Sequence, residues 1–283
     1  MAEDVAGIVL DNSQLRKINA FFATAHSQVG IIVRNCFMEA CRPKQRYTEY
    51  PGKDLEAMAF AVNYRRWIMD LLKPFLGRRI VEVGAGTGAF TEMLLETGPD
   101  RLTVLEPSPN LYFRLSKAYS KRALAGIVEV RQADFPGAFL GDGPPQKPDT
   151  AVYINVLEHI HDDAAELRTV FAALPEGGRI LIFVPALPFL MSRIDGDFGH
   201  FRRYTLRDLQ TKCVSAGFQI RLARYFDFLG VAPWWIKYCV LKSRRLESGT
   251  VRFQDRFIVP ISRGIESIVT APFGKNIIMV GEK

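Results

Sequence analysis

The chain has 283 residues, of which 48% are hydrophobic and 24% charged, the balance of an ordinary globular protein with a full core. No stretch reaches the roughly 18 apolar residues of a membrane span, the acidic start lacks the pattern of a secretory signal, and the four cysteines form no CxxC pair, so we expect a cytoplasmic protein without a disulfide framework or a zinc site. The net charge of +7 comes from one segment, because Gly199 to Arg252 contains eleven Lys and Arg residues against three acidic ones.

The first half of the chain predicts a helical cap followed by an α/β core. Apolar residues spaced as in short helices lead us to assign residues 1–52 to an N-terminal helical cap or lid, and a period near 3.6 predicts a helix over 54–77. From residue 79 onward strand-like runs alternate with helical ones, which argues for a parallel sheet with helices on both faces. The predicted strands are 79–84, 101–106, 128–134, 149–155, 178–185, 218–226 and 276–283, and the predicted helices are 89–98, 109–124, 162–174 and 206–217.

This alternation predicts an α/β fold with a doubly wound, mostly parallel seven-stranded sheet. Its core would occupy residues 53–226, and its last strand would lie in 275–283. Residues 227–274 form an insertion that is long for a connection and contains aromatic and basic residues. Because connections of this length usually form lids or binding elements, we expect the insertion to be the lid of an acceptor site.

A glycine-rich turn follows the first predicted strand. Gly84, Gly86 and Gly88 allow positive φ and let a ligand approach the bare backbone, and Glu82 precedes them by two residues. With Ala89 the glycines also satisfy a loose GxGxxG/A pattern, which a dinucleotide enzyme would show. A carboxylate would repel a pyrophosphate but attract a ligand that carries a sulfonium and an ammonium. The turn therefore predicts a cofactor that is cationic where it meets Glu82.

These residues resemble the acidic-x-Gly-x-Gly-x-Gly motif of the class I S-adenosylmethionine-dependent methyltransferases, with a domain similar to methyltransferase types 11 and 12. The resemblance implies S-adenosyl-L-methionine as the cofactor, a Rossmann-like fold and methyl transfer by direct displacement. It implies that Glu106, at the end of the second strand, accepts the ribose hydroxyls and that Ala133 and Asp134 read the adenine ring. Asn155 would border the methionine part, and Tyr64 would close over the cofactor or else be a core tyrosine.

The segment GHFRRYT, after the fifth predicted strand, carries the candidate catalytic residues. His200 is the preferred general base, because loops at this edge face the acceptor and histidine titrates near neutrality. Tyr204 is the second candidate. Arg202 and Arg203 could bind an anionic group of the acceptor, although a solvated basic turn would show the same pattern. For His200, the alternative to a general base is a purely structural role.

The sequence predicts that no metal is required. Glu158 and His159 match part of the LEH segment around which ubiquinone-type O-methyltransferases carry two acids and a histidine, but Asn155 stands where one of the acids would be expected. Because a hard divalent ion prefers carboxylates, the loss of one charge weakens such a site.

The acceptor is expected to be a small molecule. Trp234 and Trp235, beside basic residues in 233–245, could line its pocket or lie at a membrane or lipid-like surface. Nucleic acid is not the expected substrate despite a pI of about 9.3, because neither an Asn/Asp-Pro-Pro-aromatic motif nor a Pro-Cys nucleophile occurs. We expect a largely apolar acceptor with an anionic end, methylated on oxygen, nitrogen or carbon. A nicotinamide-dependent oxidoreductase and a catalytically silent binding module are the alternatives, and the oligomeric state is not predicted.

Overall fold

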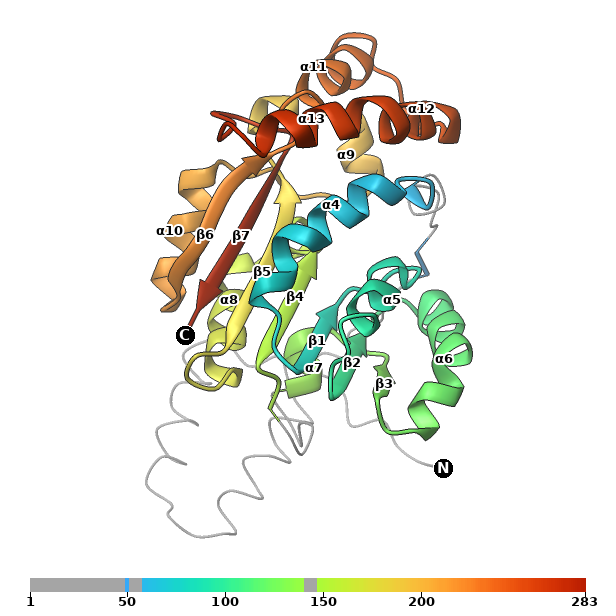
Figure 1. The fold of residues 1–283 in the computed structure, drawn as a ribbon, viewed down its shortest axis with the longest axis vertical. Coiled ribbons are helices and arrows are strands. Elements are labelled where there is room, and N and C mark those ends of the chain that lie inside the picture. The colour runs from blue at the N-terminus through green and yellow to red at the C-terminus, as the bar shows by residue number, and fades with distance from the viewer. Residues whose placement is uncertain (1–48, 51–57, 140–146) are drawn as a thin grey trace, which may run out of the picture. The chain divides into compact units, whose positions relative to one another are not determined.

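The computed structural model describes residues 49–50, 58–139 and 147–283, so the cap predicted over 1–52 lies outside the described residues apart from residues 49 and 50. One seven-stranded sheet has the order β3-β2-β1-β4-β5-β7-β6 (Figure 1). Neighbouring strands are parallel, except that β7 runs antiparallel to both β5 and β6. The predicted α/β, mostly parallel sheet is therefore confirmed. Its strands are β1 (Arg79–Val83), β2 (Arg101–Leu105), β3 (Val128–Arg131), β4 (Thr150–Ile154), β5 (Arg179–Pro185), β6 (Gln219–Phe226) and β7 (Asn276–Glu282).

Helices cover both faces of the sheet, as near-continuous apolar strands require. Because side chains alternate along a strand, Leu181 of β5 belongs to one core cluster and Ile182 to the other. The first cluster contains side chains of α4 (Val62–Leu72), α5 (Ala89–Leu95) and α6 (Pro109–Leu124). The second contains side chains of α7 (Phe135–Phe139), α8 (Asp163–Ala173) and α10 (Leu206–Ala216). The sheet and the helices on its two faces therefore form three layers (Figure 1).

Within the described part of the helix expected over 54–77, the regular α-helix covers only α4. Among the described residues it runs as α4 and then passes into the 3₁₀ turn η1 (Lys73–Phe75), where a proline prevents a regular continuation. The start of α4 is capped from far away in the sequence. The Asp255 carboxylate accepts the backbone N–H groups of Asn63 at 3.0 Å and Tyr64 at 2.9 Å. The insertion therefore stabilises the helix that covers the sheet.

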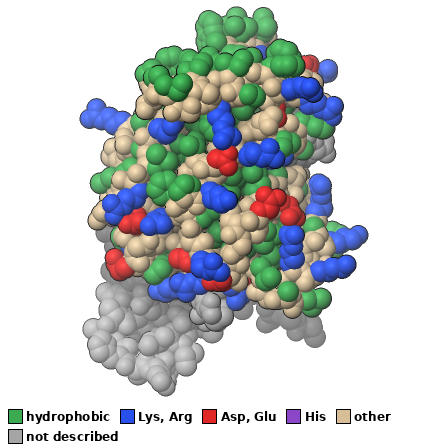
Figure 2. All heavy atoms as spheres, viewed as in Figure 1, with side chains coloured by type: hydrophobic (Ala, Val, Ile, Leu, Met, Phe, Trp, Pro, Cys, Tyr) green, Lys and Arg blue, Asp and Glu red, His purple; other side chains and the backbone are tan. Residues whose placement is uncertain are grey.

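The insertion between β6 and β7 is helical. It comprises α11 (Val231–Trp234), the π-helical η4 (Trp235–Val240), and a longer run made of α12 (Ser248–Phe253), the π-helical η5 (Gln254–Ile258) and α13 (Val259–Glu266). These helices lie beyond the carboxyl ends of β4 and β5, next to α4, and hydrophobic side chains gather on their outer surface (Figures 1 and 2). Among the described residues, none of the helices is long and apolar enough to span a bilayer.

Candidate active site

β1 passes into α5 through a turn built on three glycines. Gly84, Gly86 and Gly88 have φ angles of 66°, 59° and 83°, in the left-handed region that favours glycine. A Cβ atom on Gly84 would lie 2.7 Å from Cγ2 of Val156, so a side chain there would displace the segment that follows β4. The absence of a side chain therefore lets the ends of β1 and β4 approach each other at the sheet edge.

Glu82 lies in β1 directly before this turn and is only 4% exposed. Its Oε2 accepts a hydrogen bond of 2.6 Å from the Thr91 hydroxyl. Burial raises the pKa of Glu82 to about 8; the bond from Thr91 opposes this effect, and the charge of Glu106 adds to it. A cationic ligand beside Glu82 would favour the ionised carboxylate and reverse the shift. The position is therefore suited to a positively charged ligand.

Glu106 directly follows β2 and is also 4% exposed. Its Oε2 accepts the N–H of Gly86 at 2.7 Å, and its Oε1 accepts the N–H of Ser108 at 2.9 Å. Burial raises the pKa of Glu106, and the two backbone hydrogen bonds act in the opposite direction. Because each carboxylate oxygen has two lone-pair sites, each can accept one more hydrogen bond, for example from a sugar hydroxyl.

A cavity of about 390 Å³ joins the glycine turn to the segments that follow β4 and β5. Asn155 lines it with a φ of 53°, and its N–H donates to the Phe183 carbonyl at 2.8 Å. Tyr64 lines it from α4, and its hydroxyl donates to Oδ1 of Asn276 at 2.8 Å. Trp234 lines it from α11. A cavity of this size suits a small-molecule site with a few placed polar groups.

The same cavity is lined by a histidine that contacts a buried carboxylate. Nδ1 of His200 lies 3.1 Å from Oδ1 of Asp195, which is fully buried in α9 (Arg193–Asp197). Nε of Arg203 donates to the same Oδ1 at 2.8 Å. Burial alone would raise the pKa of Asp195, but His200 and Arg203 lower it. Because an ionised carboxylate only accepts, Nδ1 is assigned the proton, and Nε2 is left to accept another.

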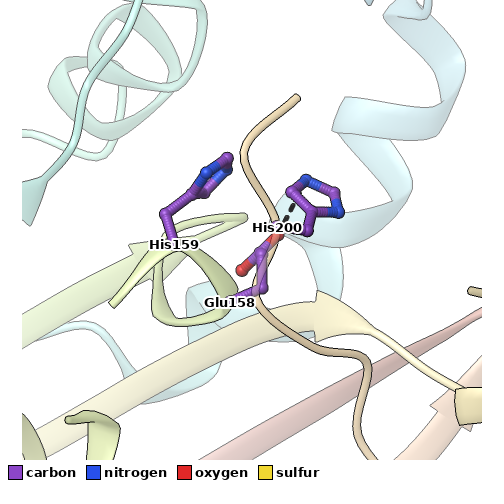
Figure 3. Close-up of side chains that lie close together, drawn as sticks. All are labelled: Glu158, His159 and His200. Atoms are coloured by element: carbon purple, nitrogen blue, oxygen red, sulfur yellow. Dashed lines mark ion pairs between the residues drawn. The ribbon is translucent and has the colours of Figure 1, made fainter. Parts of the chain in front are cut away.

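On its other side, His200 lies close to Glu158 and His159 (Figure 3). Glu158 is fully buried in η2 (Leu157–His159), with Oε1 4.0 Å from Nε2 of His200 and no hydrogen-bond partner for either side-chain oxygen among the described residues. Burial raises the pKa of Glu158 to about 7 and lowers the pKa of His159 to about 4. One ligand atom from each residue lies within 4.8 Å of the others, so two imidazoles and a carboxylate could hold a metal ion. The expectation that no metal is required stays a prediction.

Most of the site residues predicted from the sequence lie around this one cavity. Those that line it are Tyr64, Glu82, Gly84, Gly86, Glu106, Asn155, His200, Arg203 and Trp234. Gly88 lies behind the turn, where a Cβ would be 2.9 Å from Cδ2 of Leu115. Ala133 and Asp134 follow β3 at the same sheet edge without lining the cavity, and Oδ1 of Asp134 accepts the N–H of Gly137 at 2.8 Å. Their contact with an adenine ring stays a prediction.

Three further predicted residues, Arg202, Tyr204 and Trp235, do not line the cavity either, and the contacts or exposure of each argue against its expected role. Tyr204 is fully buried, its hydroxyl donates to Oδ2 of Asp163 at 2.8 Å, and burial raises its pKa, so it is not a suitable base. Arg202 pairs with the same carboxylate at 2.9 Å and donates to the His161 carbonyl at 2.7 Å, which leaves it unsuited to clamp an acceptor. Trp235 is 47% exposed and does not line this cavity.

Sequence reasoning did not identify Asp195, Lys275 or Asn276. Asp195 precedes His200 by five residues, and an acid so close to a candidate base was a usable signal. Lys275 and Asn276 line the cavity because β7 lies between β5 and β6 in the sheet. No local pattern in the sequence marks that position.

A family model described as a methyltransferase domain matches residues 56–223. Among curated proteins, a stretch of 107 residues is 32% identical to demethylspheroidene O-methyltransferase of Rhodobacter capsulatus, and one of 107 residues is 32% identical to ubiquinone biosynthesis O-methyltransferase of a Methylobacterium species. These stretches cover 37% and 38% of this chain. They span only 25% and 40% of the two relatives, so the likeness concerns less than half of either protein.

Solved structures share the fold. An S-adenosylmethionine-dependent methyltransferase from Mesorhizobium loti matches with a TM-score of 0.52 and 16% identity, over 77% of this chain and 98% of that one. Another from Archaeoglobus fulgidus matches with a TM-score of 0.53 and 16% identity, over 81% of this chain and 98% of that one. At such identities the likeness is evidence for the fold alone, and the family model carries the assignment.

Proposed function

The chain belongs to the class I S-adenosylmethionine-dependent methyltransferases, and on this premise we propose that it methylates a hydroxyl group of a small, largely apolar acceptor with an anionic end. The observation that carries the proposal is a single cavity that joins the glycine turn, Glu82 and Glu106 to the Asp195–His200 pair. The names of the two partial relatives, both O-methyltransferases, support oxygen as the methylated atom.

The residues around the glycine turn fit S-adenosyl-L-methionine. When bound, this cofactor supplies an electrophilic methyl group on a sulfonium. Glu106 would hold the ribose through the remaining acceptor sites of its carboxylate, and Glu82 would hold the cationic methionine end. Gly84 and Gly86 leave the backbone accessible to the ligand, because neither has a side chain at this edge.

His200 is the proposed general base. Its Nε2 would take the hydroxyl proton of the acceptor while Nδ1 keeps its proton toward Asp195. The resulting imidazolium would lie between two carboxyl groups, because Oε1 of Glu158 is 4.0 Å from Nε2. Such a base contributes about 10²–10⁴-fold to a rate. Alignment of the hydroxyl by the cavity walls would contribute more, up to about 7–11 kcal/mol of the barrier in favourable cases.

The cavity walls support an apolar acceptor. Aromatic side chains from β5, from the segment before His200 and from the insertion line it: Phe183, Phe198 and Trp234. Aromatic rings bury a large apolar area and favour a flat ring in the ligand. Together with a proton to be removed, this composition favours a phenolic acceptor.

Lys275 is the group proposed to bind the anionic end. Its Nζ lies 2.8 Å from Oδ2 of Asp227 and 4.8 Å from the centroid of the Tyr64 ring, and an ammonium has three donors. Arg203 also lines the cavity, but three nitrogens of its buried guanidinium are already engaged: Nε and Nη2 contact Asp195 at 2.8 Å, and Nη1 donates to the Ala186 carbonyl at 3.2 Å. Lys275 therefore has the greater capacity to take a new anionic partner.

The test is a screen of phenolic acceptors, with and without a carboxylate, using radiolabelled S-adenosylmethionine. We expect the carboxylated apolar acceptors to be the better substrates, and His200→Ala to lower their turnover by about 10²–10⁴-fold without weakening cofactor binding. His161→Ala is the matched control, because His161 is an exposed histidine at the same sheet edge that does not line the cavity. Parental turnover by His200→Ala would refute the base, and a chain that binds no adenosyl ligand would refute the cofactor.

A further inference from the structure

The outer surface of the insertion is unusually apolar. Eleven of the twenty large hydrophobic side chains that are exposed in the described part of the chain fall between Trp235 and Phe273. Single exposed apolar side chains are ordinary on a protein surface, whereas a contiguous patch marks an interaction site. In Figure 2 hydrophobic side chains gather at the top of the view, where Figure 1 places α11, α12 and α13.

The helical run from α12 through η5 to α13 has its polar and apolar faces reversed. Buried residues occur every three or four positions along the run, and three of the five are polar: Val251, Asp255, Val259, Ser262 and Glu266. Exposed apolar side chains follow one another along the run with the same helical spacing: Phe253, Phe257, Ile261 and Ile265. A helix that faces water normally shows the opposite arrangement. The exposed stripe is therefore expected to have an apolar environment.

The polar residues of the buried face are used inside the protein. Asp255 caps α4, and Oε1 of Glu266 accepts the N–H of Phe228 at 2.9 Å while its Oε2 accepts from Arg224 at 3.1 Å. These contacts fix the rotation of the helical run about its axis. The apolar stripe thus faces outward because the opposite face makes specific polar contacts with the core, and we refer to the stripe with Trp235, Ile236, Val240 and Leu241 as the apolar face.

Cationic side chains border the apolar face. Residues 235–273 contain seven Lys and Arg residues and three acids, two of which, Asp255 and Glu266, are buried. Lys242, Arg252 and Arg256 are exposed. Apolar side chains bordered by Lys and Arg are typical of helices that lie in the interface of a membrane containing anionic lipids.

We propose that the apolar face docks this protein on the surface of an anionic lipid bilayer. A second copy of the chain could also cover an apolar face, but a two-fold contact would bring the cationic borders of both copies together at its edge. The biological consequence rests on the proposed function: Trp234 and Leu246 of the same segment line the acceptor cavity, so docking would hold that cavity close to the lipid. An apolar acceptor dissolved in the bilayer could then reach it.

The test is co-sedimentation of the full chain with vesicles of pure phosphatidylglycerol or pure phosphatidylcholine, without cofactor or acceptor. We expect binding to the anionic vesicles that weakens with added salt, and much less binding to the zwitterionic ones. The combined variant Phe257→Ser, Ile261→Ser, Ile265→Ser should lower the partition coefficient at least about tenfold, because it removes apolar area available to the lipid.

Two further variants make this result specific. Phe113→Ser with Leu124→Ser is the matched control, because these side chains are 69% and 91% exposed on α6, and it should sediment like the parent. Lys242→Gln with Arg256→Gln changes exposed side chains and should weaken binding to phosphatidylglycerol at low salt. This pair keeps the proposal testable if the triple serine variant does not fold.

Parental sedimentation of a folded triple variant, or of the Lys242 and Arg256 variant, would overturn the proposal. A second copy would instead cover the apolar face if the parent bound neither kind of vesicle and formed a dimer, and if the triple variant were a monomer. Calorimetry with S-adenosylhomocysteine reports on the proposed function separately. Loss of vesicle binding with retained cofactor binding therefore refutes docking alone, and the converse result refutes the methyltransferase proposal alone.

Discussion

The buried carboxyl group of Glu82 should make cofactor binding depend on pH. Burial raises its pKa to about 8, so the carboxyl group is mostly protonated in ligand-free molecules at pH 7. S-adenosylhomocysteine carries an ammonium group in its methionine part. With that end beside Glu82, the ionised carboxylate is favoured in the complex, so binding near neutral pH should release a proton from Glu82.

The sign of the effect follows from this proton release. The affinity should rise by up to about tenfold per pH unit between about pH 6 and pH 8, and should level off above that range, where Glu82 is already ionised. The contribution of Glu82 to the stability of the ligand-free fold has the opposite trend. The folded pKa is raised from 4.5 to about 8, so that contribution is present below 4.5 and is lost as the pH rises through about 8.

Calorimetric titrations of S-adenosylhomocysteine over this pH range, in two buffers of different ionisation enthalpy, measure the affinity and the protons released. Glu82→Gln is the comparison, because an amide has nearly the same shape and cannot ionise. The ratio of parent to variant affinity isolates Glu82 from the titration of the ligand itself. We expect this ratio to increase with pH up to about pH 8. A ratio that stays constant, with equal proton release in both proteins, would refute the placement of the cationic end beside Glu82.

Three other predictions follow from the same site. Glu106→Ala should weaken S-adenosylhomocysteine binding by about 10- to 100-fold, because hydrogen bonds to the ribose worth about 1.5–3 kcal/mol in total are lost; an unchanged affinity in calorimetry would place the ribose elsewhere. Methyl transfer should persist in EDTA, and loss of turnover that magnesium or zinc restores would instead make Glu158, His159 and His200 metal ligands. Trp234→Ala should lower turnover in steady-state kinetics while cofactor affinity stays within about twofold of the parental value. Parental turnover in that variant would show that the acceptor binds elsewhere.

The strands of the sheet and the glycine motif could be predicted from the sequence, because both depend on local patterns. Apolar runs flanked by turn residues mark strands that are buried on both faces, and the predicted strands from 79–84 to 178–185 correspond to β1 to β5 within a few residues. Glu82 and the three glycines lie within residues 82–88, so their arrangement at the end of β1 could be predicted from their spacing. Glu106 could be placed at the same edge because parallel neighbouring strands end together.

The proposed acceptor side of the cavity depends instead on long-range contacts that the sequence does not reveal. Lys275 enters the site because β7 lies antiparallel between β5 and β6, a pairing of distant segments that no local period encodes. Tyr204 and His200 are four residues apart, and only the packing of their loop against Asp163 and Asp195 separates a buried hydroxyl from an imidazole that lines the cavity. The apolar stripe of the run from α12 to α13 was not identified from the sequence, and its outward direction depends on polar contacts such as that of Glu266 with Phe228, 38 residues away. Local patterns specify which side chains share a face of an element, whereas long-range contacts decide what that face meets.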